Sequence, residues 1–249
     1  MTGLYVAPQT GKLRDECVFY HVMEIPGHGL LGESWDLRAG VDDYLGHVPL
    51  ANQRVLEIGP ASGFVTFHME RQGAEVVSVE LGPDSDWDVV PHARLDVARI
   101  LEVRRAGMQM IRNSFWFAHE RLGSRARVHH GTAYELPDEL GRFDLAILGS
   151  VLLHMRDPLR ALERCARLSD ALVITETYSH ELGEGPVARL YPTVDSSQWD
   201  TWWSFTPQLL KQFLEVLGFR RVTVTHHSQT FVNAGAAMQI PMVTLVARR

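Results

Sequence analysis

The stretch RVLEIGPASG, from Arg54 to Gly63, decides the fold of this chain. Residues 55–58 are apolar except for one glutamate and predict a short buried strand. Residues 59–63 are small and predict a turn before a helix that starts near Phe64, because small residues let the backbone approach a ligand closely. The stretch indicates a nucleotide-binding corner, although a plain strand-to-helix connection has the same outline.

A second strand that ends in a carboxylate favours the nucleotide interpretation. The run EVVSVE predicts a buried strand whose last residue is Glu80, about 20 residues after the glycines. A carboxylate at this place can accept two hydrogen bonds from a ribose diol. A dinucleotide pyrophosphate requires G-x-G-x-x-G, whereas the sequence has Glu57-x-Gly59-x-Ala61-x-Gly63. The glycine spacing therefore argues against a dinucleotide cofactor.

This pattern resembles that of the class I S-adenosylmethionine (SAM) methyltransferases, with Ala61 in place of the commoner middle glycine. The resemblance covers about residues 50–249 and includes SVLLHMRDP (150–158) and Gly218-Phe219. It implies SAM as the cofactor. Together with the alternation of strands and helices, it predicts an α/β, Rossmann-like, doubly wound, mostly parallel seven-stranded sheet with a terminal antiparallel strand.

The second half also looks like the tRNA wobble-uridine carboxymethyltransferase branch. The similarity lies in GSVLLHMRDPLRAL (149–162) and in the W-x-x-FTPQLLKQFLEVLGF pattern that ends at Phe219. That branch carries a longer N-terminal extension, which is absent here. This difference argues against the tRNA interpretation, and the sequence does not indicate whether the donor is SAM or a carboxylated derivative.

Composition limits the partners of the protein. The 249 residues carry a net charge of −6, and this argues against extensive contact with nucleic acid, although a local basic patch is compatible with it. Cys17 and Cys165 stand far apart, which favours reduced thiols. Neither a secretory leader nor a run of about 18 apolar residues is present. We expect a soluble, cytoplasmic protein without a membrane partner; the sequence does not indicate its oligomeric state.

Three segments are expected to surround one methyltransferase domain. Residues 1–48 are interpreted as a cap over the cofactor pocket, with a packing arm along the sheet edge as the alternative, and 49–249 as the domain itself. Lid insertions are expected near 81–126 and 177–205, because these intervals are too long for plain connections. The first insertion contains a predicted helix, Leu95 to Leu122, that Gly107 is expected to kink or split. The last two strands, predicted over 220–225 and 242–247, are expected to flank a long loop, 228–241.

The resemblance implies most of the cofactor site. Trp35 and Arg38 are added because an arginine can pair bidentately with the methionyl carboxylate and a tryptophan can form a wall beside it. Thr132 stands where an aspartate is common beside the adenine. The expected cofactor-binding residues are Trp35, Arg38, Glu57, Gly59, Pro60, Ala61, Gly63, Glu80, Leu81, Gly131, Thr132, Ala133, Gly149 and Ser150.

Methyl transfer from a sulfonium needs orientation and, for an OH or NH acceptor, a base. His154, which follows the predicted fourth strand, is the candidate base, with a purely turn-shaping role as the alternative. Tyr178 and His180 are the further catalytic candidates. No metal is expected, because histidine pairs such as His129-His130 alternate faces along a strand and cannot chelate together.

Aromatic residues in the covering segments suggest a small acceptor with aromatic or apolar character, for example a specialised metabolite. The candidate substrate-binding residues are Tyr20, Trp199, Trp202 and Trp203. The sequence thus predicts a SAM-dependent methyltransferase acting on a small molecule. A tRNA base-modifying enzyme and a non-catalytic SAM-binding protein on the same fold are the alternatives.

Overall fold

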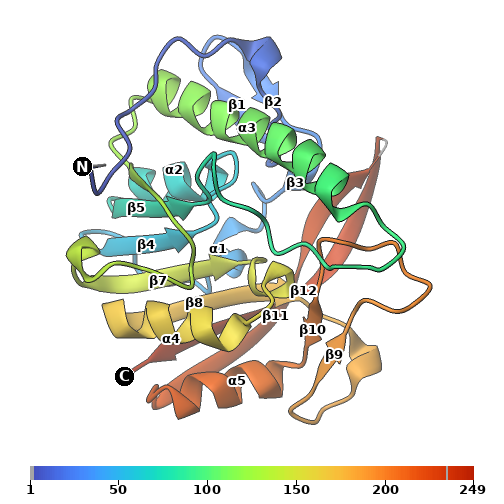
Figure 1. The fold of residues 1–249 in the computed structure, drawn as a ribbon. Helices are drawn as coiled ribbons and strands as arrows, with labels where there is room; N and C mark the ends of the chain where they lie inside the picture. The colour runs from blue at the N-terminus through green and yellow to red at the C-terminus, as the bar shows by residue number, and fades with distance from the viewer. Residues whose placement is uncertain (1–2, 234) are drawn as a thin grey trace.

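The parallel sheet of the computed structural model, which describes residues 3–233 and 235–249, confirms the Rossmann-like α/β fold. The strand order is β3-β11-β12-β8-β7-β4-β5-β6, which Figure 1 shows from one side. Five of these strands run parallel: β4 (Arg54–Ile58), β5 (Glu75–Glu80), β6 (Arg127–His130), β7 (Phe143–Gly149) and β8 (Ser169–Thr177). In addition to the seven expected strands, the sheet contains the two-residue β3 (Trp35–Asp36) at one edge. Residues 1–2 of the expected cap lie outside the described range.

The turn between β4 and α2 (Phe64–Arg71) requires its small residues. Gly59, Ala61 and Gly63 all have positive φ, of 72°, 48° and 91°. A Cβ atom at Gly63 would lie 2.4 Å from the ring of Phe67, so no larger residue fits there without moving the helix. The local sequence therefore fixes both the direction of the turn and the start of α2.

The C-terminal hairpin differs from the sequence prediction. Strands β11 (Arg221–Asn233) and β12 (Ala236–Arg248) are each 13 residues long and pair throughout, so the loop expected over 228–241 is wrong. Strand β11 has many exposed positions, where polar side chains meet water, and β3 pairs with it only at Thr230 and Phe231. One of its polar residues, Gln229, is buried and donates to the carbonyl oxygen of Gly40 at 2.7 Å. Strand β12 is antiparallel to β8, as the terminal antiparallel strand was predicted to be.

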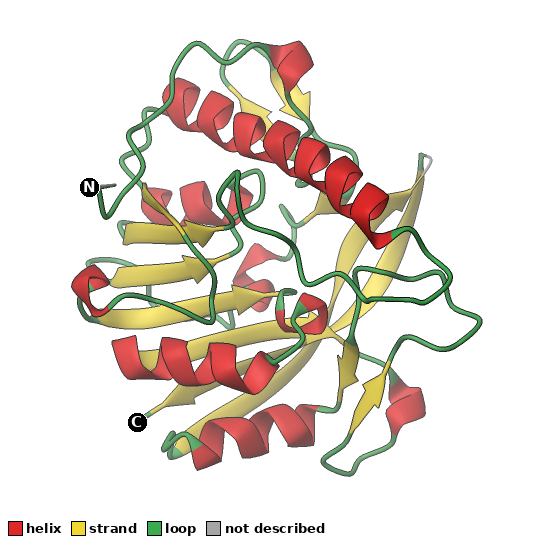
Figure 2. Cartoon of the chain, in the orientation of Figure 1, coloured by secondary structure: helices red, strands yellow, loops and turns green. Residues whose placement is uncertain are grey.

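Helices cover both faces of the sheet (Figure 2). Successive strand residues enter different apolar cores: Val55 packs with residues of α2 and α3, whereas Leu56 packs with residues of α4 and α5. This gives the three layers of a doubly wound protein. The helices are α1 (Val41–Tyr44), α2, α3 (Val97–Leu122), α4 (Pro158–Leu168) and α5 (Pro207–Val216).

The remaining elements lie in the expected cap and lid segments. Helix α3 runs unbroken for 26 residues, so the expected interruption at Gly107 is wrong; a Cβ atom there would meet open space. No helix within the described residues is both long and apolar enough to span a bilayer. The short elements are β1 (Met23–Ile25), β2 (Gly29–Leu31), β9 (Ala188–Leu190), β10 (Trp203–Phe205), and 3-10 helices over Arg14–Glu16, Asp138–Leu140, Leu152–His154 and His180–Leu182.

Glu176 near the end of β8 is a buried carboxyl group that supports the chain beyond β7. Its Oε1 accepts the backbone N–H of Leu152 at 2.8 Å, while its Oε2 is buried without a partner. Burial raises the pKa of Glu176 from 4.5 to about 8. The group therefore keeps its proton in the folded protein over a pH range in which the unfolded chain has lost it.

This difference predicts a pH-dependent stability. Between about pH 4.5 and 8 the unfolded state releases the proton of Glu176 and the folded state keeps it, so stability falls as pH rises. In Glu176→Gln, which does not titrate, urea unfolding should show a flatter pH dependence, by up to about 1.4 kcal/mol per pH unit. The exposed Glu184→Gln is the control. Parallel stability curves for wild type and Glu176→Gln would contradict the assignment.

Candidate functional site

Two adjoining cavities lie beyond the carboxyl ends of β4, β5 and β7, where open parallel sheets bind ligands. The first has a volume of about 190 Å³ and the second of about 180 Å³. Both are bordered by the turn after β4 and by the chain after β7. The residues that line both cavities are Gly59, Glu80, Trp87, Val151 and His154.

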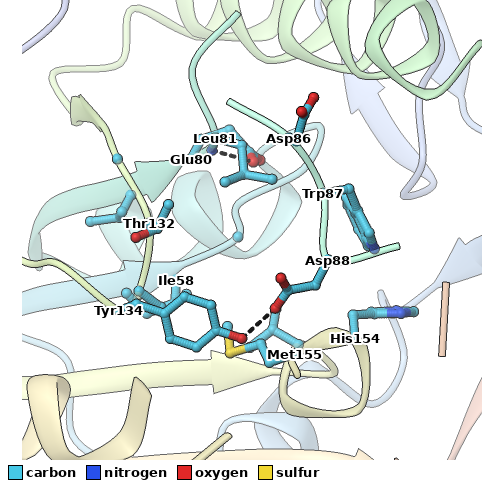
Figure 3. Close-up of a pocket in the computed structure, with 15 residues that line it drawn as sticks. Ile58, Glu80, Leu81, Asp86, Trp87, Asp88, Thr132, Tyr134, His154 and Met155 are labelled. Carbon is cyan, nitrogen blue, oxygen red and sulfur yellow. Dashed lines mark hydrogen bonds between the residues drawn. The ribbon is translucent and has the colours of Figure 1, made fainter. Parts of the chain in front are cut away.

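Glu80 stands between the cavities at the end of β5. Its Oε1 accepts the backbone N–H of Leu81 at 2.8 Å (Figure 3), and the backbone N–H of Ala61 supports the same carboxylate. Burial raises the pKa of Glu80, while these donors and the charge of Arg112 partly offset that effect. The carboxylate is thus held in one orientation where a ligand diol can reach it.

The first cavity is closed by the chain after β6 and by the loop after β5. The expected residues Leu81, Gly131, Thr132 and Ala133 all line it. Figure 3 shows Tyr134 donating its hydroxyl hydrogen to the carboxylate of Asp88. This bond ties the loop after β5 to the chain after β6, so the two segments that close the cavity hold each other in place.

The N-terminal segment forms one wall of the second cavity. Tyr20 and Trp35 line it and are joined by a hydrogen bond in which Trp35 Nε1 donates to the Tyr20 hydroxyl at 3.1 Å. His21 beside them is buried, and its Nδ1 has no partner. Burial lowers the pKa of His21 to about 4, so the ring is neutral at pH 7. The opposite wall contains the expected residues Ala61, Gly149 and Ser150.

His154 is held in a defined tautomer at the border of the two cavities. Its Nδ1 contacts the carbonyl oxygen of Asp200, and because a carbonyl only accepts, this nitrogen carries the hydrogen. In the neutral ring Nε2 therefore has a free lone pair. Burial lowers the pKa of His154, which keeps that lone pair available at neutral pH. The ring packs edge-to-face against Trp87, with centroids 5.3 Å apart.

Four of the expected cofactor residues do not line either cavity. Arg38 is exposed and binds Asp36 through two hydrogen bonds of 2.7 and 2.8 Å, because the carboxylate lies only two residues away. Glu57 is buried below the turn, where its carboxylate accepts the Ser78 hydroxyl at 2.9 Å. Pro60 and Gly63 shape the turn from its far side.

The further catalytic candidates Tyr178 and His180 lie away from both cavities. The backbone N–H of Tyr178 donates to the carbonyl oxygen of Pro241 at 2.9 Å, so the chain follows the long hairpin instead of returning over the site. Its ring packs against His180 and His226, with centroids 4.5 and 4.7 Å away. The unexpected length of the hairpin explains this displacement.

The tryptophans expected to bind substrate instead hold residues 199–203 in place through hydrogen bonds. Trp202 Nε1 donates to the carbonyl oxygen of Asp88 at 2.6 Å, and Trp203 Nε1 donates to that of Arg156 at 3.3 Å. The carbonyl oxygen of Trp199 accepts the N–H of Val90 at 2.8 Å. Trp199 and Trp202 therefore join segment 199–203 to the loop after β5, Trp203 joins it to the chain after β7, and none of the three lines either cavity.

The sequence reasoning missed several cavity residues. Trp87 and Arg104 both lie in the first expected lid insertion, but neither is among the expected site residues. Asp200, His21 and Tyr44 complete the second cavity. Among residues 3–233 and 235–249, no three His, Cys, Asp or Glu side chains are grouped so that they could hold a metal ion.

The fold and the carboxylate at the end of β5 define a protein that binds a nucleoside-containing cofactor. A family model described as "Methyltransferase domain" matches residues 36–224, more than half of the chain, so the protein belongs to this family. It is a SAM-dependent methyltransferase, as the sequence predicted. The match is to the general domain and gives no support for the tRNA wobble-uridine branch. A search of curated proteins found none that matches this sequence.

Solved structures share the fold at low sequence identity. The N-terminal domain of EvdMO1, determined with S-adenosylhomocysteine (SAH) and D-fucose, is 19% identical over 91% of this chain and 89% of that chain, with a TM-score of 0.56. Magnesium protoporphyrin IX methyltransferase from Synechocystis PCC 6803 with bound SAM is 12% identical over 86% and 78%, with a TM-score of 0.52. The 1,6-didemethyltoxoflavin-N1-methyltransferase of Burkholderia thailandensis with SAH is 22% identical over 85% and 75%, with a TM-score of 0.50.

The position of Glu80 leads to a test by ligand binding. We expect Glu80→Ala to weaken SAH binding by about 10-fold to 150-fold, because a charge-assisted hydrogen bond contributes roughly 1.5 to 3 kcal/mol. Isothermal titration calorimetry measures this change. Glu102→Ala removes the same charge from an exposed position on α3 and should bind SAH normally. Equal affinities for wild type and Glu80→Ala would contradict a role in binding the ribose.

Proposed function

We propose that this enzyme transfers the methyl group of SAM to a small-molecule acceptor. The observation that carries the proposal is the second cavity, which adjoins the Glu80 carboxylate and is bordered by the N-terminal segment, α3 and Asp200. It adjoins the first cavity of about 190 Å³, so the two together offer room for a cofactor and a ligand, and the net charge of −6 argues against a polyanionic acceptor.

The two cavities suggest a division of the cofactor site. In this proposal Glu80 binds the ribose diol, and Gly131, Thr132 and Ala133 form the adenine wall of the first cavity. Gly59 and Ser150 are at the border with the second cavity, where the methionyl end is expected. Supporting this division, the buried His21 Nδ1 has no partner among the described residues, so a ligand group can complete its hydrogen bonding.

The covering segments complete the proposed domain organisation. Residues 1–48 serve as a cap, because Tyr20, His21 and Trp35 come from this segment and line the second cavity. The insertions at 81–126 and 177–205 serve as lids that meet each other through Val90 and Trp199. Cys17 and Cys165 are buried free thiols, which fits a reducing, cytoplasmic location.

In this proposal, methyl transfer depends on the orientation of the acceptor and on one base. SAM supplies a methyl group that its sulfonium already activates, so the protein has to align the acceptor and, for an OH or NH acceptor, remove a proton. We assign the proton to Nε2 of His154, whose Nδ1 is held by the Asp200 carbonyl. Tyr20, whose pKa is raised by burial, is suited to donating a hydrogen bond to the acceptor.

A labelling experiment tests the acceptor class. The enzyme and SAM with a radiolabelled methyl group are incubated with a cell extract separated into small-molecule and RNA fractions. We expect label in the small-molecule fraction only. Label in RNA would overturn the proposal in favour of a tRNA base-modifying enzyme. SAH binding without transfer to any fraction would favour the non-catalytic alternative.

A second prediction concerns His154 and the acceptor found in this way. His154→Gln should retain SAH affinity while turnover falls by about 100-fold, the usual range for losing general-base assistance. Because burial lowers the pKa of His154, wild-type turnover should stay level as pH falls to 6.5 and decline only below it. That acidic decline should disappear in the variant. Equal losses of SAH binding and turnover would instead mark His154 as a turn-shaping residue.

A further inference from the structure

The second cavity is bordered by two hydrogen-bond donors that have no acceptor. Nε of Arg104 and Nε1 of Trp87 are buried without a partner within the part of the chain that the structure describes, and both residues line the cavity. Buried N–H groups are nearly always hydrogen-bonded in folded proteins. Two such donors beside one cavity therefore indicate a ligand that brings oxygen acceptors.

Arg104 is stacked on an aromatic surface and forms no salt bridge with any described residue, although the charges of Asp200 and Glu80 act on it. Its guanidinium lies 3.9 Å from the ring centre of Trp87 and 5.8 Å from that of Trp199. Burial lowers the pKa of Arg104, so its positive charge has lost part of its hydration. The next residue, Arg105, is in contrast exposed and pairs with Asp86 at 2.6 Å. The stacking fixes the position of the Arg104 guanidinium and leaves it free to bind an anion.

Asp200 also lines this cavity and could serve as a counter-ion of Arg104, but its carboxylate is bound by other side chains. Its carboxylate accepts hydrogen bonds from the side chains of Gln198 and Thr201, and no described carboxylate is within ion-pair distance of Arg104. The charge of Arg104 acts on both Tyr20 and His154, as well as on Glu80. The free cation therefore stands near the proposed base, on the acceptor side of the site.

We propose that Arg104 and Trp87 bind a carboxylate of the acceptor, so that the substrates are planar aromatic acids. This inference rests on the proposed small-molecule function and gives its substrate class. The guanidinium provides paired donors for a carboxylate, and the indole N–H provides another. The neighbouring indole and phenol rings of Trp87, Trp35 and Tyr20 suit a flat aromatic body.

Binding of simple aromatic probes tests this substrate class. Wild-type protein saturated with SAH is titrated with benzoate and, separately, with the neutral isostere benzamide, using ligand-observed NMR. We expect benzoate to bind at least about 10-fold more tightly than benzamide. Arg104→Gln should remove this preference, and Trp87→Phe should reduce it. Arg99→Gln makes the same charge change at an exposed site on α3 and should keep the full preference.

The methionyl carboxylate of the cofactor is the other source of the same chemistry. SAH and 5′-methylthioadenosine, which lacks the amino-acid part, are therefore titrated into wild type and Arg104→Gln. Unchanged affinity for both nucleosides supports the acceptor assignment and shows that the variant is folded. A tenfold loss for SAH alone would overturn it in favour of the methionyl group. The acceptor assignment would also be overturned if wild type and Arg104→Gln preferred benzoate equally, or if wild type showed no preference. Failure of the wild type to bind SAH would overturn the proposed function itself.

Discussion

The buried carboxylate of Glu57 is the interaction on which the cofactor corner depends. It accepts hydrogen bonds from the hydroxyl groups of Thr66 on α2 and Ser78 on β5, and so joins the first parallel strand to the following helix and strand. Burial raises the pKa of Glu57 to about 7, which shows how strongly this position disfavours an unpartnered charge. Because the Glu57 carboxylate fixes β4, α2 and β5 relative to one another, the turn between β4 and α2 is held in place. Glu80, at the end of β5, lies beside this turn.

The inner strands of the sheet could be predicted because local sequence determines them. Val76 and Val77 belong to an apolar run buried on both faces, the pattern of a central parallel strand. The second half of β11 could not, because it carries polar residues and its neighbour β3, which pairs with it only at Thr230 and Phe231, is far away in the sequence. Gln229 is buried where it donates to the carbonyl oxygen of Gly40, which is far away in the sequence. Long-range pairing, which sequence periodicity does not contain, determines the length of the hairpin.

The same distinction separates the predictable and unpredictable parts of the site. Glu80 is the last residue of β5 and Thr132 lies two residues after β6, so the ends of those strands locate them. Arg104 lies in the middle of a long helix, and its importance appears only when the tryptophans of two distant segments meet around it. The prediction that Arg38 binds a carboxylate was chemically sound. Its neighbour Asp36, two residues earlier in the sequence, provides that carboxylate within the protein itself.

Closure of the site and preparation of the proposed base are linked through one segment. The backbone N–H of Trp202 donates to the carbonyl oxygen of Leu153 at 2.8 Å, next to His154 in the chain. Asp200, two residues earlier, provides the carbonyl oxygen that holds His154 Nδ1. If the segment moved away, the imidazole would lose the partner that fixes its tautomer, and the second cavity would lose one wall. The position of Asp200 that forms part of the cavity wall is therefore also the one that leaves His154 Nε2 able to accept a proton.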